Sequence, residues 1–454
     1  MLELPEEGSL VAQHSLFDEL DAQASGVSAP PRRRESRPDA RERAAWEAWK
    51  ARLLPGFVAP YCQASRLHRS CWWVDGLAAG RSQRGESGSA AFADTADALA
   101  ASGFTLHGAR LEASKASDKA PESAGTNGAN PIPEQQPGAQ RNGRSTSGPQ
   151  SLAAAGALAA PTTETLTPLP REALLTTLGL GPAILLLNPF ATPKLSAEEL
   201  VSLGQRQAPT ELLLTISVAQ LEHVATQDLA GPLTPEAGGQ DRPDSPPALT
   251  ALLRSDTWKT VWTGPGKSAE KVRRTLELLR GMLKAHFLYV CVATLDDLPT
   301  AAPRRLLLFA SRHYPSVALL NDFLCAEQAR LARERETQAL QGSWFARRRE
   351  TARAAAWAAL KEELHALGRL RRARLWPDLK PLLVLDHFGQ FSTADHDAAL
   401  LELLREGRIA CRWSPAAPPA DAGASNEAPP VERVPGPQDF LEFLEARTRP
   451  VWRR

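Results

Sequence analysis

An acidic residue at the end of a short apolar run is the first place in the chain where we expect chemistry. Asp75 closes the run Cys71–Val74, and small residues follow it, among them Gly76, Ala78 and Gly80. Small residues let the backbone approach a bound nucleoside, and an acid after the next strand, here Glu112, accepts hydrogen bonds from ribose hydroxyls. The pattern predicts a nucleoside-cofactor site. An ordinary strand-to-helix turn is the alternative, because no Gly-x-Gly-x-x-Gly is present and Glu112 follows later than the usual distance of about 20 residues.

A second polar stop closes the apolar run Ile184–Leu187 with Asn188-Pro189-Phe190. In some amino-methylating enzymes an Asn or Asp in such a stretch accepts a hydrogen bond from the target amine, while an aromatic ring stacks on the base. Asn188 and Phe190 are therefore predicted to be catalytic, although a strand end stopped by proline explains the same residues. We expect both apolar runs to be parallel strands that open at their carboxyl ends into one crevice, where open α/β sheets bind ligands.

A basic stretch runs from Arg347 to Arg374 and begins with three consecutive arginines: Arg347, Arg348 and Arg349. Clustered arginines hold the phosphates of nucleic acids. A solvated, salt-bridged helix face is the alternative, and the heavy use of arginine throughout the chain agrees with it.

Composition limits the class of protein. The chain has 454 residues and a formal net charge of +1, so it is long enough for two domains, and its bulk charge gives no argument for nucleic acid. Five cysteines without a Cys-x-x-Cys pair predict free thiols in a reducing compartment and no metal site. The N-terminus lacks the pattern of a secretory signal, and no stretch approaches the roughly 20 apolar residues that span a bilayer. We expect a cytoplasmic protein that does not bind membranes.

Alternating helix and strand patterns predict the elements that position these residues. Strand, helix and strand in succession form the unit of a parallel sheet, so the fold class is α/β with a Rossmann-like, mostly parallel sheet. Ser268 is predicted to cap a long amphipathic helix, and a hairpin is predicted to close the sheet. The predicted elements of this part are helices 45–54, 89–101, 171–178, 197–206 and 268–284, and strands 71–74, 104–112, 184–187, 209–217, 287–295 and 305–311.

The C-terminal part has the outline of a winged helix. An apolar helix (376–385) precedes a capping box at Ser392–Asp395, a second helix, a strand over 408–413 and a later strand near Val431–Val434. The predicted organisation is a disordered extension (1–43), a sheet domain (44–325) with disordered insertions at about 113–168 and 231–247, a basic helical connector (326–375), and a winged-helix domain (376–454) with a long loop at about 414–430.

Four stretches, taken in order, resemble the three-Cys-motif partner protein (TcmP) family, whose members have a class I methyltransferase-like domain followed by a winged helix. They are similar to the family's Asp-x-Phe-Ala-Gly-Pro-Gly and Gly-Ser-Pro stretches, its Asp-Pro-(Phe/Tyr)-Gly, its late strand with a Ser-x-His-Pro turn, and its C-terminal winged helix. In this chain the stretches are Trp73–Gly80 with Gly88-Ser89-Ala90, Leu187–Phe190, Leu307–Pro315 and Phe391–Trp413. The resemblance covers roughly residues 44–450 apart from the insertions.

This resemblance implies a methyltransferase that uses S-adenosylmethionine and has a three-Cys-motif protein as its partner. Asp75, Gly76, Ala78 and Gly80 would face the methionine part of the cofactor, Glu112 would bind the ribose, and Asn188 with Phe190 would position the methyl acceptor. The chain departs from the family pattern at Ala79, Arg81, Asn188 and Ala191. A second hypothesis follows from these departures: a non-catalytic Rossmann-like scaffold that presents the winged helix and the basic stretch to nucleic acid or to a protein.

Overall fold

The structure is a computed structural model of the chain. It describes residues 40–65, 68–77, 86–112, 166–190, 195–230, 246–295, 305–338, 342–371, 374–414 and 433–444. Nearly all of the predicted N-terminal extension and of the two predicted insertions, together with most of the predicted 414–430 loop, lies outside these residues.

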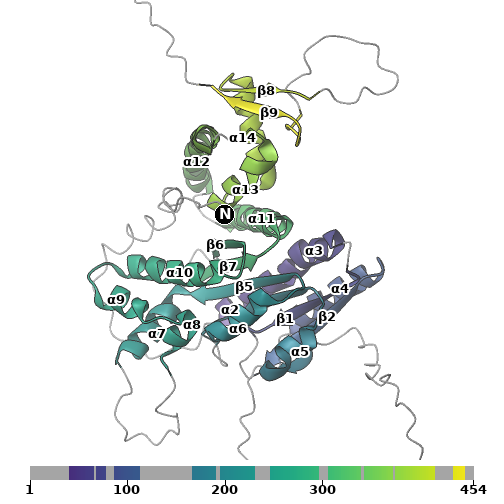
Figure 1. Ribbon diagram of the computed structural model, residues 1–454, viewed down its shortest axis with the longest axis vertical. Coiled ribbons are helices and arrows are strands. Elements are labelled where there is room, and N and C mark those ends of the chain that lie inside the picture. The colour runs from purple at the N-terminus through teal and green to yellow at the C-terminus, as the bar shows by residue number, and fades with distance from the viewer. Residues whose placement is uncertain are drawn as a thin grey trace, which may run out of the picture.

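A seven-stranded, mostly parallel sheet forms the centre of the α/β fold (Figure 1). Its strand order is β3-β2-β1-β4-β5-β7-β6, and β7 runs antiparallel to both of its neighbours, as the predicted hairpin requires. The strands are β1 Ser70–Asp75, β2 Thr105–Glu112, β3 Thr167–Pro170, β4 Ala183–Leu187, β5 Thr210–Ser217, β6 Tyr289–Leu295 and β7 Arg305–Ser311.

The central strands are apolar along their whole length because helices cover both faces of the sheet. Along β4, Ile184 and Leu186 pack into the core on one face, while Leu185 and Leu187 pack into the core on the other. Successive side chains of a strand point to opposite faces, so a strand buried on both sides cannot alternate with polar residues. Each leucine fully buried in this way contributes roughly 2 kcal/mol to folding.

Two layers of helices enclose the sheet (Figure 1). One layer consists of α2 Ala40–Leu53, the π-helical turn η1 Leu54–Val58, α3 Ala59–Ala64, α4 Glu86–Ala100 and α11 Tyr314–Gln338. The other consists of the 3-10 turn η2 Arg171–Ala173, α5 Leu174–Leu178, α6 Ala197–Gln205, α7 Val218–Ala230, α8 Ala248–Leu253, α9 Thr257–Thr263 and α10 Ser268–Lys284. Within the described part of the chain, no helix is both long enough and apolar enough to span a bilayer.

The C-terminal unit stands beyond α11 at one end of the molecule (Figure 1). It has its own core, in which Leu360 and Leu364 pack with Leu379 and Leu400. The last turns of the basic helix therefore belong to this unit. Its elements are α12 Gly342–Arg371, α13 Trp376–Asp386, α14 Thr393–Arg405, β8 Ile409–Arg412 and β9 Phe440–Phe443, of which the two strands pair antiparallel.

Helix α11 joins the sheet to the C-terminal unit through polar contacts that are largely sheltered from solvent. Asn321 is fully buried; its amide donates to the Phe391 carbonyl at 2.9 Å and its oxygen accepts from the Gly389 backbone at 2.7 Å. Gly389 has a φ of 77°, a left-handed conformation that favours glycine in the turn between α13 and α14. Asp322 accepts from the backbone and the hydroxyl of Thr393 at the start of α14.

Two of the sequence predictions are wrong. Val434 is not in a strand: Pro435 and Pro437 follow it, and Asp439 accepts from the Gly436 backbone and so holds a turn there. The partner of β8 is β9, which begins at Phe440. Ser268 does not cap α10, because Lys267 occupies the N-cap position without a side-chain bond.

Some elements were not predicted at all. Strand β3 carries Pro168 and Pro170 and falls partly inside the predicted 113–168 insertion. It lies at the sheet edge, which is where a strand tolerates proline because no partner needs the missing N–H group.

Candidate functional site

The carboxyl ends of β1 and β4 lie side by side, at the point where the strand order reverses. Asp75 is in register with Leu186, and the Gly76 backbone donates to the Leu186 carbonyl at 2.8 Å. Asn188 follows two residues later. On the other side of β1, Asp75 is in register with Arg110, so Glu112 ends β2 two residues further along. The predicted site residues Asp75, Gly76 and Asn188 therefore meet at the edge where doubly wound sheets bind ligands.

A buried lysine reaches Asp75 from helix α2. The Lys50 ammonium lies 3.0 Å from the Asp75 carboxylate and 2.7 Å from the Glu47 carboxylate, and Lys50 is only 4% exposed. Burial acts to lower the pKa of Lys50, but the two carboxylates outweigh burial and hold that pKa above its ordinary value. The other Asp75 oxygen accepts from the Leu77 backbone at 2.9 Å. Asp75 is thus the anionic half of a buried ion pair.

Gly76 is required by packing within the sheet. A Cβ atom on this residue would lie 2.4 Å from the Leu187 side chain and 3.3 Å from the Leu186 carbonyl oxygen. The absence of a side chain therefore lets β1 and β4 approach each other at this end. Close approach of a ligand is not needed to explain the glycine.

Asn188 and Phe190 form a turn that is bonded to its own surroundings. The Asn188 oxygen accepts from the Phe190 backbone at 2.9 Å, and its amide donates to Gln220 on α7 at 3.0 Å. Phe190 is 7% exposed and packs in the sheet core. Asn188 is half-buried at the strand end, whereas the Phe190 ring does not present an open face for stacking in this conformation.

The structure does not describe all of the remaining predicted site residues. Ala78 and Gly80 lie outside the described residues, as do the side chains of Glu112, Arg348 and Arg349. Arg347 is exposed on α12, in the C-terminal unit, and is not brought to the edge of the sheet. In the part of the chain that the structure describes, no group of three or more His, Cys, Asp or Glu side chains is arranged to hold a metal ion.

Sequence reasoning missed a buried polar cluster at the opposite edge of the sheet. Glu211 near the start of β5 is fully buried; one of its oxygens accepts from the Ser316 hydroxyl at 2.9 Å, and the other has no partner among the described residues. Burial raises the pKa of Glu211 to about 7, and the hydroxyls of Ser311, Ser316 and Tyr61 offset only part of that rise. The signal in the sequence was a single acid within the apolar run of β5.

No family model matches the chain, and no curated protein or solved structure is significantly similar to it.

Proposed function

We propose that this chain is a methyltransferase-like protein that binds S-adenosylmethionine at the carboxyl edge of β1 and β4. The observation that carries the proposal is the strand order. Strands β3-β2-β1-β4-β5 follow the doubly wound order, and the antiparallel strand β7 lies between β5 and β6; this layout is compatible with the methyltransferase-like domain that the resemblance implies. The meeting of Asp75 and Asn188 at the switch point of this sheet also supports it.

The residue types at this edge are compatible with the cofactor, because both carboxylates could accept hydrogen bonds from it. A carboxylate at the end of β1 suits a cationic amino group, and Glu112 at the end of β2 suits ribose hydroxyls. When bound, S-adenosylmethionine supplies an electrophilic methyl group. Asn188 would orient an amine acceptor through its side-chain oxygen, which already accepts one hydrogen bond and has a second lone pair. Because methyl transfer depends mainly on alignment, such a site needs no strong acid or base.

Calorimetric titration of the full chain with S-adenosylmethionine tests the proposal. The matched variant replaces both halves of the ion pair, Lys50→Gln with Asp75→Asn, so that a neutral hydrogen bond remains and no buried charge is left alone. We expect the wild type to bind and the double variant to bind at least tenfold more weakly while melting at a similar temperature. No heat with the wild type at millimolar ligand would refute cofactor binding.

The second candidate is a non-catalytic scaffold, and one observation favours it. The side chains expected to serve the cofactor and the acceptor are already engaged inside the protein: Asp75 with Lys50, Asn188 with Gln220, and Phe190 in the core. In this hypothesis the sheet domain positions the C-terminal unit, which acts as a winged helix formed by α13, α14 and the β8–β9 hairpin.

The charges of the C-terminal unit indicate which of its surfaces would contact nucleic acid. Helix α14 carries Asp395, Asp397 and Glu402, and its basic residues are Arg405 and the fully buried His396, so it is poorly suited to approach phosphates. The exposed arginines Arg347 and Arg353 lie on α12. We expect mobility shifts of a DNA or RNA duplex at low salt that are lost on replacing Arg347, Arg348 and Arg349 with glutamine. Unchanged shifts in that variant would contradict a role for α12.

The resemblance that suggested a methyltransferase also suggests a three-Cys-motif protein as partner. An acidic α14 that is unsuited to phosphates is compatible with a protein partner at the C-terminal unit. Co-purification of the two chains tests this, with charge reversal of Glu402 and Glu406 as the variant; retention of the partner by that variant would exclude α14 as its binding surface.

A further inference from the structure

A cavity of about 630 Å³ lies between α11, α12 and the turn that leads into α14. This volume is within the range of pockets that hold small molecules. Its wall includes Ala326, Ala329 and Ala332 of α11, and Gln328 and Gln390 also line it. The cavity is formed by helices of the C-terminal part and is separate from the strand ends described above.

Two arginines from different helices line this cavity, and most of their guanidinium N–H groups have no partner among the described residues. Among the residues described, the Arg333 guanidinium bonds only to the Ala329 carbonyl of its own helix, at 3.2 Å. The Arg353 guanidinium lies 3.6 Å from Asp395, which is too far for a hydrogen bond, and its side chain is 66% exposed. A guanidinium has five donors, so each of these side chains can still bind an anion.

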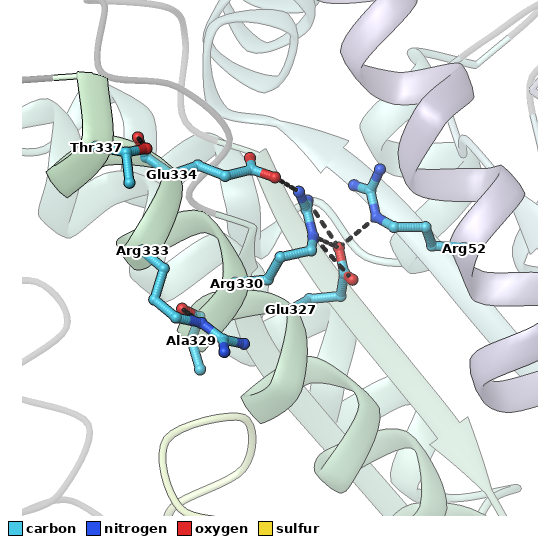
Figure 2. A network of polar contacts seen from close by, with 7 residues as sticks. All are labelled: Arg52, Glu327, Ala329, Arg330, Arg333, Glu334 and Thr337. Atoms are coloured by element: carbon cyan, nitrogen blue, oxygen red, sulfur yellow. Dashed lines mark hydrogen bonds and ion pairs between the residues drawn. The ribbon is translucent and has the colours of Figure 1, made fainter.

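The neighbouring Arg330, in contrast, has a guanidinium that is engaged in ion pairs. Arg330 donates to both Glu327 and Glu334, and Glu327 also accepts from Arg52 of α2 at 2.7 Å (Figure 2). Figure 2 shows Arg333 apart from this network, alongside Ala329. Arg52 and Glu327 thus join α2 to α11, Arg330 bonds within α11, and Arg333 takes no part in this network.

The two acidic residues that line the cavity, Asp322 and Asp395, form hydrogen bonds at the start of α14. Both oxygens of Asp322 accept from Thr393, and one oxygen of Asp395 accepts from the backbone and the hydroxyl of Ser392. The other Asp395 oxygen, which faces Arg353, accepts no hydrogen bond within the described residues. It remains as an acceptor 3.6 Å from the Arg353 guanidinium.

We propose that this cavity binds a nucleotide. The two guanidiniums suit a phosphate group, and the Asp395 oxygen that accepts no hydrogen bond suits a sugar hydroxyl. The small side chains of Ala326, Ala329 and Ala332 leave room for a base against α11. The glutamine amides offer hydrogen bonds to the edge of that base. A nucleotide phosphate can come from a free nucleotide or from the end of a nucleic-acid strand, and the geometry is common to both.

Calorimetric titration of the full chain tests the proposal. The probes are AMP, ribose 5-phosphate, inorganic phosphate and a 5′-phosphorylated oligonucleotide of dT. We expect AMP to bind to the wild type. Arg333→Gln and Arg353→Gln should each lower the affinity for AMP at least tenfold. Ala329→Leu should lower it by a similar factor, because the larger side chain fills part of the cavity. Arg330→Gln is the matched control, because its guanidinium is engaged elsewhere, and it should bind AMP as the wild type does.

Each outcome distinguishes the sources or overturns the proposal. Oligonucleotide binding at least tenfold tighter than that of AMP, with the same dependence on Arg333 and Arg353, identifies a strand end as the ligand. Inorganic phosphate or ribose 5-phosphate binding as tightly as AMP overturns the nucleotide, since the base then contributes nothing. No binding of any probe at millimolar concentration, or equal loss in Arg330→Gln, also overturns it. The Lys50→Gln with Asp75→Asn variant should keep full AMP affinity, which separates this cavity from the proposed S-adenosylmethionine site.

Discussion

Replacing Glu211 by glutamine should stabilise the protein above neutral pH. Glu211 is fully buried, one of its carboxylate oxygens has no partner among the described residues, and burial raises its pKa from 4.5 to about 7. The folded state then holds the proton more tightly than the unfolded state. The stability that this residue contributes is complete below pH 4.5 and is lost as the pH rises through 7.

The magnitude follows from the size of the pKa shift. At about 1.4 kcal/mol per pKa unit, the rise from 4.5 to about 7 corresponds to roughly 3 kcal/mol of unfolding free energy lost between pH 4.5 and pH 8. Glutamine keeps an acceptor for the Ser316 hydroxyl and carries no charge at any pH. Glu211→Gln should therefore match the wild type near pH 4.5 and exceed its stability by about 3 kcal/mol at pH 8.

Urea unfolding followed by tryptophan fluorescence at pH 4.5, 6, 7 and 8 measures this difference. Glu198→Gln is the control, because Glu198 is an exposed acid on α6 and its replacement removes one carboxylate without touching the buried cluster around Glu211. A stability difference for Glu211→Gln that stays constant across this pH range would refute the reasoning, since Glu211 would then titrate alike in the folded and unfolded states.

The remaining predictions concern the strand ends and the C-terminal unit. Lys50→Met should lower the unfolding free energy by about 3–5 kcal/mol, because Asp75 is then a buried charge without a partner. Adding Asp75→Leu should restore most of that free energy. A double variant no more stable than Lys50→Met would contradict this. Gly76→Ala should cost about 1–3 kcal/mol through contact with the Leu187 side chain, and an unchanged melting temperature would show that the strand ends can separate. Ser392→Ala should cost about 1 kcal/mol by removing the capping box with Asp395, as measured by thermal unfolding against Thr393→Ser as control.

The sequence was sufficient to predict the sheet because its strands are buried on both faces. Apolar runs such as Ile184–Leu187 and Leu212–Leu214 carry that signal without knowledge of their neighbours, and the polar residues that end them mark the carboxyl edge. The adjacency of Asp75 and Asn188 followed from this. Strand β3 was missed because its two prolines are compatible with a strand only at an edge, and edge position is a property of the whole sheet.

The partners of the site residues could not be predicted in the same way. The sequence pattern indicates that Lys50 lies on the charged face of helix α2. Only the packing of that helix on the sheet brings its ammonium to Asp75, 25 positions later in the chain. Asn188 likewise meets Gln220 through the docking of α7. Glu211 carried a local signal, a lone acid in an apolar strand, but its neighbours Tyr61 and Ser316 come from distant helices.

The two hydrogen bonds of the Asn321 side chain have a mechanical consequence. Its amide and its oxygen both bond to the turn between α13 and α14, while the adjacent Leu320 and, one turn earlier, Val317 are buried against the sheet. Helix α11 therefore connects the two units directly. We expect the C-terminal unit to keep its orientation relative to the sheet as long as these bonds hold. A load applied to the C-terminal hairpin should therefore strain the sheet before it displaces the unit.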